Sequence, residues 1–116
     1  MRLGDLKGSA LRIAPGQAVA YVTDAAPSPE NREKILRLAH EADQLFIEAV
    51  FLESDRPLAL ASLHLTAWEA GSIAREAGVR FVTPFHHSAR YLAEPSALRE
   101  ELFESFRAVD RNAMRA

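Results

Sequence analysis

Apolar residues fall into two patterns along this chain, unbroken runs and stripes that recur every three or four positions. The unbroken runs predict buried strands at residues 18–22, 44–51 and 79–82. The third run ends at Thr83-Pro84, and a proline there is expected to stop further ladder pairing. The remaining segments predict loops at residues 1–8 and 52–63 and a short strand at residues 11–13.

The apolar stripes predict three helices, each with a recognisable start. Ser28 precedes Pro29, a residue that is favoured at the first helical position, and Thr66 with Glu69 has the spacing of a capping box. The third helix is expected to begin after Ser96. Because strands and helices alternate in this order, the pattern predicts an α/β fold with mostly parallel strands and three helices.

Composition limits the class of protein without naming a partner. The chain has 116 residues, the size of one domain, and 48% of them are hydrophobic. Its formal net charge of −2 gives no chain-wide attraction to nucleic acid. The absence of cysteine excludes disulfides and thiolate metal sites and agrees with a cytoplasmic location. No apolar run approaches the ~18 residues of a membrane span, so we expect no membrane association.

Ionisable residues gather near the ends of the predicted strands. Asp24 follows the first strand, Glu48 lies near the end of the second, and His64 precedes the second helix. His86 and His87 follow the third strand. In a parallel sheet these positions share the edge where ligands bind, and carboxylates with imidazoles suit Zn²⁺ or Mn²⁺. Each residue alone also fits a structural role, so the prediction of a site depends on their position at the same edge of the sheet.

Four ordered motifs carry a resemblance to a known family. They read Ala20-Tyr21-Val22-Thr23-Asp24, Ile47-Glu48-Ala49-Val50-Phe51, His64-Leu65-Thr66-Ala67 and His86-His87-Ser88-Ala89-Arg90-Tyr91. With these motifs the chain resembles the C-terminal half of ribonuclease Z-type proteins of the metallo-β-lactamase fold, nearly from end to end. The resemblance implies that residues 1–116 form a single half-domain, one half of an αβ/βα sandwich.

The resemblance also implies a role for each residue at the predicted edge. Asp24 would be the carboxylate that bridges two metal ions, and His86 a terminal ligand of one ion. Glu48 and His64 would be the catalytic pair that orients the scissile phosphate or protonates the leaving oxygen. The last motif would supply residues that support its loop, namely His87, Ser88, Arg90 and Tyr91. The implied cofactor is zinc or manganese, and the implied substrate of the complete enzyme is RNA.

The chain departs from the family pattern at several positions. Ala25 follows Asp24 where the family usually has a hydroxyl residue, and His87 replaces a usual Phe. Ile47 and Val50 stand where ribonuclease Z commonly has His and Thr. These departures leave a broader phosphodiesterase or metallohydrolase activity open beside tRNA processing.

The family's His-x-His-x-Asp-His motif does not occur in this sequence. Of the family's metal ligands, only the counterparts at Asp24 and His86 are present. We therefore expect the C-terminal portion of a metal-dependent phosphodiesterase that binds little or no metal and is inactive alone. The alternative is a non-catalytic interaction or ligand-binding module that keeps the fold.

The implied sandwich predicts a partner as well. Since the family packs two αβ halves sheet against sheet, an isolated half exposes the face that the other half would cover. Three helices are too few to cover both faces of strands that are apolar throughout. We therefore expect a homodimer, or a complex with a complementary N-terminal half, with Phe46 or Phe81 at the contact.

Overall fold

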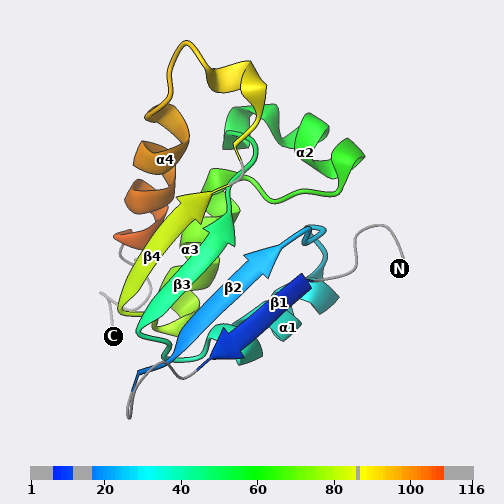
Figure 1. The fold of residues 1–116 in the computed structure, drawn as a ribbon. Coiled ribbons are helices and arrows are strands. Elements are labelled where there is room, and N and C mark those ends of the chain that lie inside the picture. The colour runs from blue at the N-terminus through cyan, green and yellow to red at the C-terminus, as the bar shows by residue number, and fades with distance from the viewer. Residues whose placement is uncertain (1–6, 12–16, 86, 109–116) are drawn as a thin grey trace, which may run out of the picture.

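A computed structural model describes residues 7–11, 17–85 and 87–108 of the chain. Four strands form one sheet in the order β1 (Lys7–Leu11), β2 (Val19–Thr23), β3 (Gln44–Glu48) and β4 (Phe81–Phe85). β1 pairs antiparallel with β2, while β2, β3 and β4 run parallel, as Figure 1 shows. The predicted α/β class with mostly parallel strands is confirmed.

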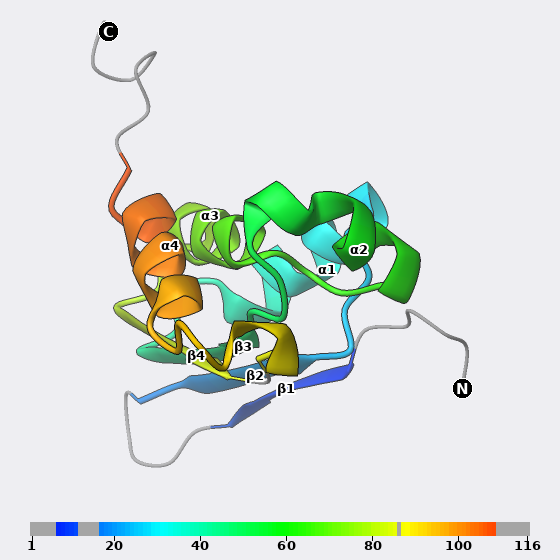
Figure 2. The same cartoon turned by 90° about the horizontal axis from the view of Figure 1, so that it is seen from above.

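The helices gather on one side of this sheet (Figure 2). They are α1 (Pro29–Ala39), α2 (Arg56–Ser62), α3 (Ala67–Ala77) and α4 (Ala97–Phe106), with short 3-10 turns η1 (Glu53–Asp55) and η2 (Ala89–Tyr91). The opposite side of the sheet carries no helix in the described part of the chain. None of these helices is long and apolar enough to cross a membrane.

The prediction of a loop over residues 52–63 is wrong, because η1 and α2 occupy most of it. Pro57 lies in the first turn of α2, where its missing N–H costs nothing. The helix is hard to detect from an apolar stripe, since Leu58 and Leu60 are both exposed. It ends at Leu63, whose left-handed φ of 59° turns the chain toward α3.

Strand boundaries also differ from the prediction. β3 ends at Glu48, whereas the predicted strand continues to residue 51, and β4 begins at Phe81 and not at residue 79. β4 does not stop before Pro84, which pairs with Ile47, and the ladder continues to Phe85. Because β4 is an edge strand, the proline can occupy a position that donates no ladder bond. At the other end, Lys7–Leu11 forms β1 where residues 1–8 were expected to be a loop, and residues 12–13 lie outside the described part.

The helix starts follow the sequence signals at two of three places. Ser28 Oγ accepts a hydrogen bond from Asn31 N, and Thr66 and Glu69 form the complete capping box. Ser96 precedes α4 but makes no capping bond with its side chain. The start of α4 therefore depends on packing more than on its cap.

The helix-covered face of the sheet holds the hydrophobic core. Alternate strand residues are buried there, among them Ala20, Val22, Leu45, Ile47 and Val82. The intervening residues point to the open face, where Tyr21 is 44% and Phe81 54% exposed. The rings of Tyr21 and Phe46 stack there with centroids 4.6 Å apart. The predicted exposed apolar sheet face is therefore present.

α3 and α4 pack closely because α3 presents a glycine to its neighbour. A Cβ on Gly71 would lie 2.3 Å from the backbone oxygen of Leu102 and 2.8 Å from Ser105 Cβ. Ser105 Oγ donates a hydrogen bond to Trp68 O across the same contact, at 2.7 Å. This contact fixes α4 beside the start of α3, next to the edge that carries the candidate site.

Candidate metal and catalytic site

Three of the predicted residues meet at the edge where β2 and β3 end. Asp24 follows β2, Glu48 is the last residue of β3, and His64 lies just before α3. Their candidate ligand atoms all lie within 4.8 Å of one another. The parallel strands place the first two residues side by side, and the turn after α2 adds the third.

Glu48 is fully buried and its carboxylate is satisfied by three donors. Oε1 accepts from Ala25 N at 3.1 Å, and Oε2 accepts from Leu65 N at 3.4 Å. Oε2 also lies 2.8 Å from His64 Nδ1. An ionised carboxylate only accepts hydrogen bonds, so this contact with ionised Glu48 requires a proton on Nδ1 of the imidazole. These bonds offset the cost of burying an acid inside an apolar strand.

The backbone at the site includes two left-handed residues. Asp24 has a φ of 54°, and Leu63, which precedes His64, has a φ of 59°. Aspartate tolerates this region better than most residues, whereas leucine adopts it at a cost of roughly 1 kcal/mol or more. Strained backbone of this kind is common at functional sites. In this chain it produces sharp turns at the two places that present Asp24 and His64.

The loop after β4 is attached to the end of β3 on both sides of residue 86. Phe85 O accepts from Ala49 N at 3.0 Å, and His87 Nδ1 lies 3.0 Å from Ala49 O. Ser88 N donates to Val50 O at 3.1 Å. His86 itself lies outside the described residues, so its role as a metal ligand stays a prediction. His87 is engaged with the backbone and does not join the cluster of Asp24, Glu48 and His64.

The other predicted support residues contact the η1 turn. Tyr91 donates its hydroxyl proton to Asp55 Oδ2 at 2.5 Å and accepts from Leu52 N at 3.0 Å. Burial, and then the bond to the Asp55 carboxylate, raise the pKa of the Tyr91 phenol. Arg90 Nε lies 3.3 Å from the same Asp55 oxygen, while Ser88 Oγ accepts from Arg90 N. These contacts join the loop after β4 to η1, and the predicted supporting role of these residues at a catalytic site stays a prediction.

Sequence reasoning missed Asp55, the partner of Tyr91 and Arg90, and two charged residues beside it in η1 and α2. Asp55, Glu53 and Arg56 were assigned to a loop, although the i, i+3 spacing of Glu53 and Arg56 is a known helix pair. Glu101 comes from α4 and accepts from Glu53 N at 2.9 Å. Nothing in the local sequence could have indicated that contact.

The donor set fits a divalent metal only in part. Asp24 offers a carboxylate oxygen of the kind that bridges metal ions, and imidazole nitrogens suit zinc. Glu48 and His64, however, already bind each other, which matches an orienting pair better than two ligands. In the described part of the chain, Asp24 is therefore the residue best suited to bind a metal directly.

Comparison with known proteins identifies the superfamily. The family model of the beta-lactamase superfamily domain matches residues 4–87. The chain belongs to this superfamily. Within it, the chain is 44% identical over 79 residues to ribonuclease Z of Thermobifida fusca, covering 68% of this chain and 24% of that protein. It is 40% identical over 94 residues to ribonuclease Z of Streptomyces coelicolor, covering 78% and 30%.

Solved structures of the superfamily share the fold. The metallo-beta-lactamase fold protein YhfI of Bacillus subtilis matches with a TM-score of 0.69 and 23% identity, over 87% of this chain and 42% of that one. A long form RNase Z from yeast matches with a TM-score of 0.58 and 26% identity, over 66% and 10%. The chain thus spans about a quarter to a third of these two bacterial ribonuclease Z proteins and less than half of YhfI.

Proposed function

We propose that this chain is the C-terminal portion of a metal-dependent phosphodiester hydrolase of the ribonuclease Z type, acting on RNA in the cytoplasm. The observation that carries the proposal is the convergence of Asp24, Glu48 and His64 within 4.8 Å at one edge of the parallel strands. Similarity to proteins named ribonuclease Z supports the reaction class. The absence of cysteine agrees with the location.

In the complete enzyme, Asp24 and His86 would hold the metal, which supplies Lewis-acid stabilisation of charge on the phosphate. The chain's own contribution to proton transfer comes from His64. Its Nδ1–H donates to Glu48, which fixes the orientation of the ring and assigns proton transfer to the other ring nitrogen, Nε2. When protonated, Nε2 can give its proton to the leaving oxygen, and the Glu48 carboxylate stabilises the imidazolium.

We propose further that the chain is inactive alone. The His-x-His-x-Asp-His motif does not occur in the sequence, and zinc sites in enzymes use about three protein ligands. After dialysis, the purified chain should hold almost no zinc or manganese by elemental analysis and should not hydrolyse bis-p-nitrophenyl phosphate. One equivalent of tightly bound metal would contradict this part of the proposal.

Complementation tests the assigned roles. The chain would be mixed with the N-terminal part of Thermobifida fusca ribonuclease Z that precedes its similar region, and hydrolysis should appear only in the mixture. Asp24→Ala should remove both metal and activity. His64→Ala should lower turnover by roughly 10²- to 10⁴-fold, the usual contribution of general acid catalysis, and leave the metal content nearly intact.

His40→Ala serves as the matched control, because His40 is exposed and pairs only loosely with Glu41 at 3.8 Å. It should leave turnover unchanged. Equal loss of metal in the Asp24 and His64 variants would show that their roles are not separate.

The second candidate function, an interaction module, is favoured by the open face of the sheet. Tyr21, Phe46 and Phe81 lie on that face, and we propose that a second copy of the chain covers it when no N-terminal half is present. Phe81→Asp should convert a dimer to monomers or insoluble chain in light scattering. Leu58→Asp on exposed α2 is the control and should leave the dimer intact. A wild-type monomer at high micromolar concentration would contradict the dimer.

A further inference from the structure

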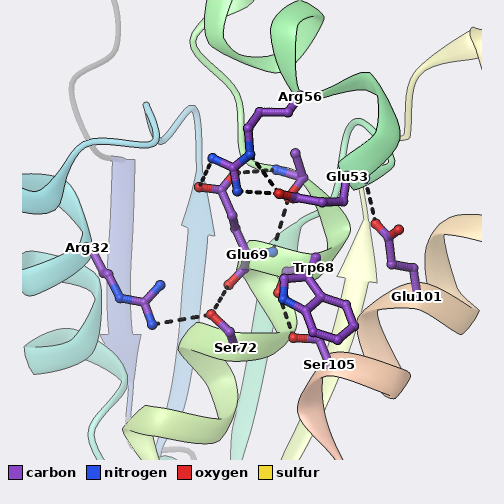
Figure 3. A network of polar contacts seen from close by, with 9 residues as sticks. Arg32, Glu53, Arg56, Trp68, Glu69, Ser72, Glu101 and Ser105 are labelled. Atoms are coloured by element: carbon purple, nitrogen blue, oxygen red, sulfur yellow. Dashed lines mark hydrogen bonds and ion pairs between the residues drawn. The ribbon is translucent and has the colours of Figure 1, made fainter. Parts of the chain in front are cut away.

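A second ionic cluster lies around the η1 turn (Figure 3). The guanidinium of Arg56 donates to Glu53 Oε1 from Nε at 2.7 Å and from Nη2 at 2.5 Å. Its Nη1 lies 3.6 Å from Glu69 Oε2. One arginine therefore bridges two glutamates that come from different elements, η1 and α3.

Both glutamates converge on Thr66, the buried N-cap of α3. Thr66 Oγ1 donates its only proton to Glu53 Oε2 at 2.6 Å, and Thr66 N donates to Glu69 Oε1 at 3.0 Å. Thr66 Oγ1 in turn accepts from Glu69 N at 3.1 Å. Glu53 and Glu69, the two acids that bind Arg56, therefore orient both the backbone N–H and the hydroxyl of Thr66.

Thr66 lies two positions after His64, and the residues on either side of Thr66 are held by hydrogen bonds from their backbone N–H groups. Leu65 N donates to Glu48 Oε2 at 3.4 Å, and Ala67 N donates to Phe51 O at 2.8 Å. A rotation of Thr66 would therefore pull on Leu65 and change the direction from which His64 meets Glu48. The path from Arg56 to His64 consists of ion pairs, hydrogen bonds and two peptide bonds.

The balance of charge makes Arg56 necessary for this arrangement. Glu53 and Glu69 share the single guanidinium of Arg56, and Glu101 Oε2, which accepts from Glu53 N at 2.9 Å, adds a third carboxylate on the side of Glu53. Without the guanidinium, Glu53 and Glu69 would face each other across Thr66 as like charges in a partly buried place. One of them would then move away or take up a proton, and Thr66 would lose one of its partners.

We propose that Arg56 is a positioning residue for His64, acting through Glu53, Glu69 and Thr66 to hold the imidazole on Glu48. The inference rests on the proposed function for the catalytic role of His64, but all the contacts that it uses lie within this chain. It predicts that the state of the His64 ring depends on a residue that does not touch it.

The test measures which nitrogen of His64 carries the proton. Long-range ¹H–¹⁵N correlation spectra of the labelled chain report the tautomer of each histidine, and a His64→Gln spectrum assigns the signals. The wild-type chain should show His64 as the Nδ1–H tautomer. Arg56→Met should replace that pattern with a mixture of tautomers, while the signals of exposed His40 stay unchanged.

A charge-balancing double variant separates positioning from general loss of stability. Glu69→Gln keeps an oxygen that can accept from Thr66 N but removes one of the two repelling charges. Adding it to Arg56→Met should restore the Nδ1–H pattern of His64. The control is Arg32→Ala, which removes a partly exposed pair with Glu76 and should leave His64 unaffected.

Each outcome bears on one claim. An unchanged His64 pattern in folded Arg56→Met, or no recovery in the double variant, overturns the proposal. If Arg56→Met does not fold, Arg56→Lys tests the same claim. One ammonium cannot span both glutamates, so a partial loss of the Nδ1–H pattern of His64 is expected. If instead His64→Ala leaves hydrolysis unchanged in the complemented enzyme, the proposed function fails while the positioning by Arg56 stands.

Discussion

Two acids near the end of β3, Glu48 and Glu53, are satisfied in different ways. Glu48 is fully buried, and in the described part of the chain its partners are two backbone N–H groups and the imidazole of His64. Glu53, five positions later in the sequence, is half-buried and is bound by the guanidinium of Arg56 and the hydroxyl of Thr66.

The difference separates a candidate catalytic group from a structural one. The Glu53 cluster contains its own cation, which compensates part of its negative charge locally. Glu48 is satisfied by neutral donors and a histidine, so its negative charge is available to stabilise an imidazolium during proton transfer. Two neighbouring acids of the same type thus acquire different roles through their donors.

The largest effect is expected from Glu48→Ala. It would leave two backbone N–H groups and the His64 imidazole without an acceptor in a buried place, at a cost of about 3–5 kcal/mol. Urea unfolding at pH 7 measures the loss. Glu48→Gln should cost less, because its oxygen still accepts one or two of the bonds. A loss of stability below about 1 kcal/mol for the alanine variant would show that water reaches these donors, contrary to their burial in the structure.

A smaller effect is expected from Glu53→Ala, since solvent screens this half-exposed acid. The loss of the bonds to Arg56 and Thr66 should cost about 1–2 kcal/mol in the same unfolding experiment. Combined with Arg56→Ala, it should cost less than the sum of the single variants, because both remove the same ion pair. Strict additivity would contradict a shared cluster.

The smallest effect is expected from Glu101→Gln, and its sign depends on pH. Burial raises the pKa of Glu101 above its ordinary value of 4.5, so the fold favours the protonated acid. This contribution is fully present below about pH 4.5 and is lost as the pH rises through the folded-state pKa. Glutamine stays neutral and can still accept from Glu53 N, so Tm should rise by a few degrees at pH 7.

Acidification provides the control for that prediction. At pH 4 the wild-type acid is largely protonated, so the difference in Tm between Glu101→Gln and wild type should shrink. A difference that stays constant from pH 7 to pH 4 would show that charge at position 101 is not its cause.

Residue order alone indicated the class of fold and the edge of the sheet where the residues of the candidate site lie. Apolar runs separated by capped stripes predict strands alternating with helices, since apolar runs and helix periodicity are properties of the local sequence. Asp24, Glu48 and His64 could be placed at one edge for the same reason, because each lies at the end of an element. Their motifs also gave the family before any geometry was known.

The tertiary structure decided which partner each of these groups has. Glu101 reaches Glu53 from α4, and Tyr91 reaches Asp55 from the loop after β4, contacts that join residues far apart in the sequence. Pro84 could remain in a strand because β4 lies at the edge of the sheet. Local sequence patterns indicate burial and capping. Hydrogen bonds between distant segments instead depend on the packing of the helices, such as the close approach of α3 and α4 at Gly71.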